Sequence, residues 1–422
     1  MVKFGLHAIR WLRPGPRHHV RGWAGAIVVA MAVLGGCASG SPPAQIDTIT
    51  IPAPRQVGQA WLDYLAPPRA NVLLPAGYDP HRRYPLVVFL NGLDLNYSSY
   101  ARFGLTQPFD DLGAIVVMPE GGNGWYTDWW NNGLRADPSW ESYELDTVIP
   151  TILADYPILP QRRYHALIGI SMGGLGAAYL GGRLPGFFGS VATLSGFVDP
   201  QYNGVTLQAQ MSADAEAVAN GDRDLYPIYG PPEGFYARGH NPLLLAKNLD
   251  HTRVFESTGT GVASRATPRP SRASTKEEAT VIRPMNVRYH RALVAAGVGV
   301  TYQVHAGTHS TGDFLTEINS MLAWGLFKPV VSDPASWTNE TVATSGQLWD
   351  LDYRFSSPPT QVVRFRQSGT SLAISAAGSD VTITTGAGCT IRTTTPATVQ
   401  LPSRALVSPR WPQSVGRRSC RQ

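Results

Sequence analysis

One short segment of the sequence places a serine where a nucleophile can lie. Gly169, Ser171 and Gly173 give the spacing G-x-S-x-G within GISMGG, between the apolar run ALIGI and a segment rich in small residues. On a strand–turn–helix the glycines permit a sharp turn that exposes the serine hydroxyl. The alternative is a simple turn where a strand packs against a helix. A serine nucleophile needs a histidine base, an acid that orients the base, and donors for an oxyanion.

The histidine that best fits the role of base is His309. It follows a predicted strand over residues 299–305, in the segment AGTHSTGDF. The carboxyl ends of parallel strands are where α/β sheets carry their chemistry. The sequence contexts of His165, His251 and His290 indicate structural or surface roles. We therefore predict that His309 activates Ser171.

Two backbone amides are the candidate oxyanion donors. The N–H of Met172 follows the nucleophile directly, at the start of the predicted helix. The N–H of Leu93 follows Asn91–Gly92 after an early strand, where glycine lets the backbone approach closely. The alternative for this second segment is a plain turn at the end of a strand.

The elements that must position these groups alternate between strand and helix. Apolar, β-rich runs are predicted as strands, and segments with helical spacing separate most of them. The expected strands lie within 70–78, 84–92, 113–122, 164–170, 189–196, 252–258 and 299–307, and the expected helices within 141–156, 171–184, 277–297 and 311–327. This alternation predicts an α/β fold with a mostly parallel sheet covered on both faces.

The C-terminal part of the chain has a different texture. After about residue 330, Thr and Ser become frequent and alternating runs such as QVVRFRQ and DVTITTG replace helical patterns. We predict a catalytic domain over 48–328, a small all-β domain over 329–403 and a basic tail over 404–422. Cys389 and Cys420 either pair or remain free thiols. No cofactor is implied, and no spacing of potential ligands indicates a metal site.

The N-terminal segment has the pattern of a targeting signal. Residues 1–36 hold five of the 35 Lys and Arg and no acid, and an uncharged stretch precedes LGGC. LGGC resembles a bacterial lipoprotein box, which implies a signal peptide over 1–36, lipidation of Cys37 and a tether over 37–47. The alternatives are an ordinary secretory peptide or an uncleaved anchor. The remaining 30 basic residues balance the 30 acidic ones, which disfavours a nucleic-acid partner.

With these residues placed, the chain resembles the antigen 85-type mycolyltransferases and the esterase D-like (tributyrin esterase-like) branch of the α/β-hydrolases. The resemblance covers about residues 70–327. It rests on the ordered segments NVLLPAGYDPHRRYPLVVFLNGL, VVMPEGGNGWYTDWW, GISMGG, LSGFVDP, YGPPEGFYARGHNP and GTHS. It implies an α/β-hydrolase fold, Ser171 as nucleophile, His309 as base, and Leu93 and Met172 as oxyanion donors.

The resemblance also implies where the acid lies. Many esterase D-like relatives carry an aspartate after the strand that precedes the histidine strand, but ESTGTGVAS has none there. The mycolyltransferases use a glutamate early in the following helix, where STKEEATVIR offers two. We favour Glu278 over Glu277, while Glu256, within a strand, is a weaker candidate. Solvated glutamates in a first helical turn are the alternative for at least one of the pair.

The substrate-binding residues follow from the same comparison. In the mycolyltransferases an aspartate before Gly-Leu and an arginine after it help to hold trehalose, whereas this chain has Asn91 and Asp94. We therefore do not carry over trehalose or mycolate as substrates. The segment GWYTDWW is expected beside the site. Its side chains either contact a sugar or an acyl chain or simply pack the loop; the candidates are Trp125, Tyr126, Asp128, Trp129 and Trp130.

These inferences predict a serine esterase or acyltransferase of the cell envelope that acts on lipid or sugar esters through an acyl-enzyme. The enzyme is expected outside the cytoplasm, either lipid-anchored to the membrane or secreted. The alternative function is that of a non-catalytic envelope lipoprotein that binds polysaccharide or lipid. In either case the C-terminal domain is expected to bind an envelope polymer or a protein.

Overall fold

A computed structural model describes residues 43–51, 68–132, 139–203, 211, 225–402 and 418–419. The predicted signal peptide, Cys37 and most of the basic tail therefore lie outside the described residues. In the part of the chain that the structure describes, no helix is long and apolar enough to span a membrane.

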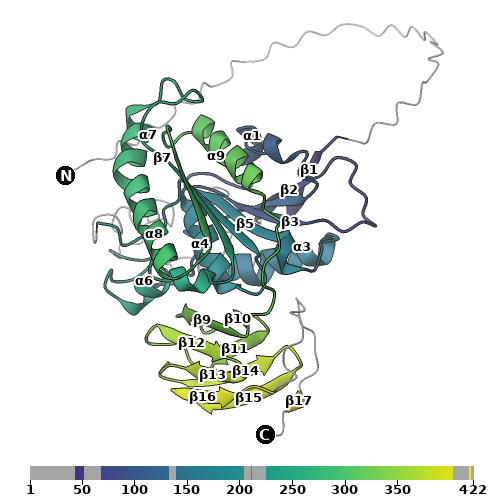
Figure 1. Ribbon diagram of the computed structural model, residues 1–422, viewed down its shortest axis with the longest axis vertical. Helices are drawn as coiled ribbons and strands as arrows, with labels where there is room; N and C mark the ends of the chain where they lie inside the picture. Colours follow the sequence, from purple (N-terminus) through teal and green to yellow (C-terminus); the bar gives the residue numbers. More distant parts are fainter. Residues whose placement is uncertain are drawn as a thin grey trace, which may run out of the picture.

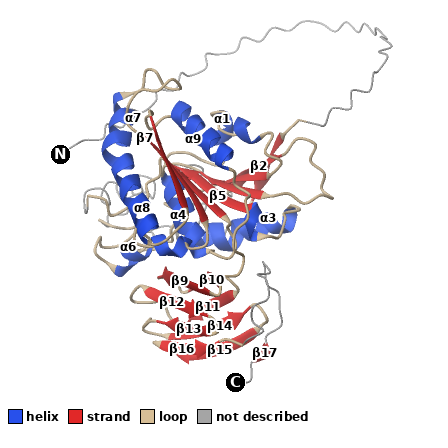
Figure 2. Ribbon diagram, in the orientation of Figure 1, coloured by secondary structure: helices blue, strands red, loops and turns tan. Residues whose placement is uncertain are grey.

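The larger part of the molecule is built on one eight-stranded sheet (Figures 1 and 2). The strand order is β1-β2-β4-β3-β5-β6-β7-β8. Strand β2 pairs antiparallel with both of its neighbours, β1 and β4, and the six strands from β4 to β8 are parallel to one another. The strands are β1 (Gln45–Thr50), β2 (Arg69–Leu74), β3 (Leu86–Leu90), β4 (Ile115–Pro119), β5 (His165–Ile170), β6 (Ser190–Leu194), β7 (Arg253–Gly259) and β8 (Val300–His305). The α/β fold with a mostly parallel sheet is confirmed.

Both faces of this sheet are covered, which explains why its central strands are continuous apolar runs. Successive residues of β3 point to opposite faces, so Val88 joins one core and Phe89 the other. The first core contains side chains of α2 (Trp140–Tyr143), α3 (Ile149–Asp155), α4 (Met172–Arg183) and α8 (Arg283–Ala295). The second contains side chains of α1 (Ser99–Arg102), the 3₁₀ turn η1 (Gln107–Phe109) and α9 (Thr311–Trp324). Shorter elements are α6 (Phe235–Gly239), α7 (Arg272–Glu277), η3 (Arg162–Tyr164) and η4 (Ala246–Leu249).

Two long helical segments each contain a wide π turn. The turn η2 (Glu144–Val148) joins α2 to α3, and η5 (Glu278–Ile282) joins α7 to α8. Each turn is followed by a proline, Pro150 or Pro284, at the second residue of the next helix. Proline has no N–H to donate to residue i−4 and its ring crowds that carbonyl, so local widening of the helix accommodates it.

The C-terminal region consists of two sheets packed around a separate apolar core (Figure 2). One has the order β10-β11-β14-β15-β17 and the other β16-β13-β12-β9; every pair is antiparallel except β15 with β17. The strands are β9 (Ser336–Thr341), β10 (Ser345–Leu348), β11 (Leu351–Phe355), β12 (Val363–Ser368), β13 (Ser371–Ile374), β14 (Asp380–Thr385), β15 (Cys389–Thr394), β16 (Ala397–Gln400) and β17 (Arg418–Ser419). The all-β C-terminal region is confirmed.

Buried arginines join the two regions. Arg183, the last residue of α4, pairs with Glu141 and donates to the Tyr353 hydroxyl (3.2 Å) and the Ser345 carbonyl (3.3 Å). Arg162 donates to the carbonyl of Val331 (2.8 Å). These guanidinium groups are desolvated, so their hydrogen bonds to the C-terminal region are needed to offset the cost of burial.

Two details differ from the sequence expectations or extend them. Residues 45–47, expected in a tether, begin β1 and pair with Val72–Leu74 of β2. This strand is missed by its pattern because it is largely exposed and carries no apolar run. Cys389 is disulfide-bonded; Cys420, the candidate partner, lies outside the described residues.

Candidate active site

Ser171 lies on a strained turn between β5 and α4. Its backbone has φ 58° and ψ −120°, outside the right-handed helical and extended regions that a serine normally adopts. The turn requires small neighbours, because a Cβ on Gly169 would lie 2.0 Å from the Gly173 carbonyl oxygen and a Cβ on Gly173 would lie 2.2 Å from that of Leu90. The glycines of G-x-S-x-G therefore let the turn close on itself and on β3.

His309 and Glu278 form a continuous hydrogen-bonded chain with this serine. His309 Nε2 lies 2.9 Å from Ser171 Oγ, and His309 Nδ1 lies 2.9 Å from Glu278 Oε2. The three residues come from separate elements: the turn after β5, the loop after β8 and the first position of the π turn η5. A neutral imidazole with its proton on Nδ1 donates to Glu278 and accepts from the Ser171 hydroxyl.

Glu278 is fully buried and held by two further donors. Its Oε1 accepts hydrogen bonds from Thr258 Oγ1 (2.8 Å) and the Gly259 amide (2.7 Å), and it also lies 2.9 Å from Ser195 Oγ. Burial alone would raise the pKa of this carboxyl, but the hydrogen bonds from His309 and Thr258 and the charge of His309 hold the pKa below its usual value. Glu278 is therefore a charged acceptor aimed at the histidine.

Glu277, the neighbouring candidate, has a different environment. Its Oε1 lies 4.0 Å from His309 Nε2, and a third of its side chain is exposed. Burial alone would lower the pKa of His309, but the charges of Glu277 and Glu278 outweigh this effect and raise it to about 9. Glu256, the weaker candidate, lies away from this chain, with its carboxylate 3.7 Å from His290.

The expected oxyanion donors lie on both sides of the serine. Met172 begins α4 directly after Ser171, and a Cβ on Gly92, next to Leu93, would lie 3.6 Å from the Ser171 Cβ. Within the described residues, neither the Leu93 nor the Met172 amide donates a hydrogen bond to a protein acceptor. Both amides are therefore available to a ligand oxygen.

The structure places Asn91 behind the loop that carries Leu93. Its side-chain amide donates to the carbonyls of Gly92 (3.0 Å) and Gly122 (3.3 Å), and its oxygen accepts from the Gly121 amide (2.8 Å). Asn91 is buried and its side-chain contacts are all internal, so it braces this loop. Asp94 is exposed and pairs with Asn123 through its backbone amide and its carboxylate.

Most aromatic residues of GWYTDWW pack the interior. Trp125, Tyr126 and Trp129 are at most 4% exposed. The Tyr126 hydroxyl donates to the Asn91 carbonyl (2.8 Å), and the Trp129 indole donates to the Gly124 carbonyl (3.2 Å). Trp125 and Tyr126 therefore pack the loop, whereas Trp129, although almost fully buried, also lines the cleft described below. Trp130 differs, because its side chain is 44% exposed.

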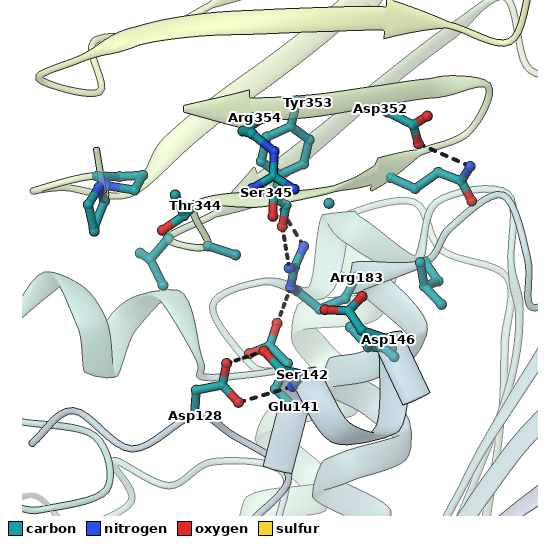
Figure 3. A pocket seen from close by; sticks show the side chains of 18 of the residues that line it. Asp128, Glu141, Ser142, Asp146, Arg183, Thr344, Ser345, Asp352, Tyr353 and Arg354 are labelled. Atoms are coloured by element: carbon teal, nitrogen blue, oxygen red, sulfur yellow. Dashed lines mark hydrogen bonds and ion pairs between the residues drawn. The ribbon is translucent and has the colours of Figure 1, made fainter. Parts of the chain in front are cut away.

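Asp128 and Trp130 line a cleft between the two regions (Figure 3). The cleft has a volume of about 1630 Å³ and lies against the far end of α4, where Arg183 is. The carboxylate of Asp128 accepts hydrogen bonds from the Ser142 amide (3.0 Å) and hydroxyl (2.6 Å) of α2. Neither Ser171 nor His309 lines this cleft.

Sequence reasoning assigned no role to the residues that hold Glu278. Ser195 lies in LSGFVDP, which carries part of the family resemblance, and Thr258 lies in ESTGTG, where the aspartate of esterase D-like relatives is absent. The available signal is their place at the carboxyl ends of β6 and β7, the two strands that follow the nucleophile strand β5 in the sheet. No group of His, Cys, Asp and Glu side chains suited to a metal ion occurs among the residues described.

Comparisons with known proteins identify the family of this chain. The Esterase family model matches residues 66–324. Esterase Rv1288 of Mycobacterium tuberculosis is 27% identical over 201 residues, which cover 46% of this chain and 43% of that protein. Thus the match spans less than half the length of this relative. Diacylglycerol acyltransferase/mycolyltransferase Ag85A of the same organism is 27% identical over 252 residues, covering 56% of this chain and 71% of that protein.

A solved structure supports the fold. The crystal structure of MPT51 from Mycobacterium tuberculosis matches with a TM-score of 0.53 at 18% identity, covering 67% of this chain and 99% of that chain. The resemblance to esterases and antigen 85-type proteins is thereby confirmed.

Proposed function

The chain belongs to the Esterase family, and from this premise we propose that it is a serine carboxylic-ester hydrolase or O-acyltransferase. Ser171 is the nucleophile, His309 the base and Glu278 the acid. The observation that carries the proposal is the hydrogen-bonded chain from Ser171 through His309 to Glu278, with 2.9 Å at both steps. Nucleophile, base and orienting acid in this order are the arrangement that activates a serine hydroxyl.

The proposed reaction has two balanced halves. Ser171 Oγ attacks the ester carbonyl carbon while His309 Nε2 takes the hydroxyl proton, and the amides of Leu93 and Met172 donate to the oxyanion. The carbon–oxygen bond to the leaving alcohol then breaks, and His309 gives its proton to that oxygen. Water or an acceptor hydroxyl next attacks the acyl-enzyme with His309 as base, and the proton returns to Ser171 as the new acid or ester leaves.

The proposed substrates are esters of lipids or sugars in the cell envelope. This assignment rests on the resemblance to acyltransferases and on the sequence pattern of residues 1–37, which suits export followed by lipidation of Cys37. Hydrolysis and acyl transfer share the acyl-enzyme, so the acceptor decides between them.

Fluorophosphonate labelling tests the mechanism. Protein without residues 1–36 is treated with the probe and the adduct is mapped by peptide sequencing. A single adduct on Ser171, greatly slowed in His309→Ala and unaffected in the control His165→Gln, is expected. No adduct on folded protein would reject the proposed nucleophile. Product analysis with a short-chain ester, with and without added trehalose or glycerol, then separates hydrolysis from transfer.

The cleft favours a second function, the binding of an envelope polysaccharide. Trp130 is exposed there and is held by ring contacts with Phe235 (5.9 Å between centroids) and Tyr236 (5.3 Å). A rigid exposed indole beside hydroxyl and carboxylate groups suits stacking on a sugar ring. In cosedimentation with purified envelope polysaccharide, Trp130→Ala should reduce binding at least about fivefold, whereas Ser171→Ala should not change it. If Trp130→Ala and Ser171→Ala bound the polysaccharide equally well, this second function would be rejected.

A further inference from the structure

A second histidine–glutamate pair lies directly behind the acid Glu278. His305, the last residue of β8, has Nε2 2.8 Å from Oε1 of Glu317 on α9. Glu317 is 1% exposed, and its Oε2 has no hydrogen-bond partner within the described residues. The mechanism above uses neither residue, yet a buried carboxylate is costly unless it is paired.

Ser195 connects this pair to the acid. Its hydroxyl lies 2.9 Å from Glu278 Oε1 and 2.9 Å from Glu317 Oε1. Ser195 itself has φ 44°, a left-handed conformation that costs a non-glycine residue energy and is concentrated at functional sites. A chain of contacts therefore runs from His309 through Glu278 and Ser195 to Glu317 and His305.

Hydrogen-bond counting assigns the charges in this chain. The two ring nitrogens of His305 face only acceptors, Glu317 Oε1 at 2.8 Å and the Ala306 carbonyl at 3.0 Å. Both nitrogens can donate only in the imidazolium form. Consistently, although burial opposes it, the Glu317 carboxylate raises the pKa of His305 to about 9. Burial and the charge of Glu278 raise the pKa of Glu317, so this carboxylate needs the charge of His305 to stay ionised.

The Ser195 hydroxyl has one proton for two carboxylate oxygens. Glu278 Oε1 already accepts from Thr258 and the Gly259 amide, whereas Glu317 Oε1 accepts, among the residues described, only from His305 besides Ser195. An ionised Glu317 therefore attracts the Ser195 proton. Each additional donor on Glu278 would lower its basicity and weaken its interaction with the His309 imidazolium that forms during the reaction.

We propose that His305 and Glu317 are positioning residues that act through Ser195: ionised Glu317 accepts the hydrogen bond from the Ser195 hydroxyl, and His305 keeps Glu317 ionised, so that Glu278 receives no donor from Ser195 and interacts more strongly with His309. This inference rests on the proposed function. When the charge of His305 or of Glu317 is lost, the Ser195 hydroxyl donates its hydrogen bond to Glu278 instead of Glu317. In both variants the weakened Glu278 holds less positive charge on His309, so the pKa of His309 falls.

The titratable groups that face this chain of contacts come from four elements. They are Glu277 and Glu278 from α7 and η5, Tyr302 and His305 from β8, and Asp313 and Glu317 from α9. β6 and β7 contribute the neutral groups Ser195 and Thr258. The charge of Glu317 is among those that raise the pKa of His309. Removing this charge is therefore expected to lower the pKa of His309.

The test compares pH profiles of fluorophosphonate labelling and of ester hydrolysis for His305→Gln and Glu317→Gln. His290→Gln is the matched control, because His290 also lies beside a buried glutamate, Glu256, but outside this chain of contacts. We expect the acid limb of both profiles to move down by at least about 0.5 pH unit in the two variants. We also expect a plateau rate up to about tenfold lower, because a weaker base is less effective, and no change in the control.

The outcomes separate this inference from the proposed function. Absence of labelling at Ser171 in the unmodified protein would reject the function itself. If folded His305→Gln is labelled normally and the acid limbs of its pH profiles do not move, only the role of His305 and Glu317 would be rejected. A limb that moves to higher pH would also reject it, because Glu317 would then remain ionised without His305. Thermal unfolding of each variant verifies the fold, and the half-buried His305 gives a readout if Glu317→Gln does not fold.

Discussion

Replacing Glu277 by glutamine is expected to increase the activity at neutral pH, although Glu277 lies beside the proposed base. Its carboxylate is 4.0 Å from His309 Nε2 and, together with Glu278, raises the pKa of His309 to about 9. At pH 7 only about 1% of a group with that pKa is neutral. Since only the neutral imidazole can accept the Ser171 proton, the charge of Glu277 reduces the active fraction of the enzyme.

The magnitude follows from distance and exposure. A carboxylate within 4–6 Å of a histidine raises its pKa by about 1–3 units. The side chain of Glu277 is one-third exposed, so solvent screening puts its effect at the low end, about one unit. Glu277→Gln should therefore increase kcat/KM at pH 7 by about five- to tenfold. Glu278→Gln also removes the acceptor that orients His309, and should lower it by about 10²–10⁴-fold.

The assay is kcat/KM for a p-nitrophenyl ester between pH 5.5 and 10, at low and at high salt. The acid limb reports the pKa of His309 in the free enzyme. High salt should move this limb to lower pH in the unmodified protein and much less in Glu277→Gln, because the main exposed charge is gone. The reasoning is refuted if the acid limb of the Glu277→Gln profile lies at the same pH as in the unmodified protein, or if Glu277→Gln loses as much activity as Glu278→Gln.

Three further outcomes follow from contacts described above. Asn91→Ala should lower kcat by about 10–100-fold with little change in KM, since Asn91 braces the loop that carries an oxyanion donor; steady-state kinetics test this. Gly169→Ala should abolish labelling of Ser171 and lower the melting temperature, because the added Cβ meets a carbonyl oxygen at 2.0 Å. Ending the chain before Val331 should destabilise the α/β region by at least about 3 kcal/mol, measured by urea unfolding, because buried Arg162 and Arg183 lose acceptors; unchanged stability would contradict this view of the interface.

The residues of the site differ in how far the sequence predicts them. Ser171 and His309 follow apolar strands closely, so the strand pattern places both at one edge of the sheet. The choice between Glu277 and Glu278 needs coordinates, because the π turn shifts the helical register by one residue at that point. Periodicity of 3.6 residues cannot tell which of two adjacent side chains such a turn directs inward.

Other contacts have no local signature. Ser195 and Glu317 are 122 residues apart, and their hydroxyl and carboxylate meet only because β6 and α9 pack together. The burial of Trp125 and Trp129 is likewise decided by tertiary packing, since the sequence of an aromatic loop is the same whether its rings pack in the core or contact a ligand. The sequence pattern does not predict β1, because an edge strand with one solvent-exposed face contains few apolar residues.

Helix α4 gives the molecule a mechanical link between its two regions. Ser171 and Met172 stand at one end and Arg183 at the other, and twelve residues of helix make a stiff rod about 18 Å long. Arg183 is clamped by Glu141 from one region and by Tyr353 and Ser345 from the other. A shift of the C-terminal sheets would therefore act directly on one end of a rigid helix whose other end carries the nucleophile.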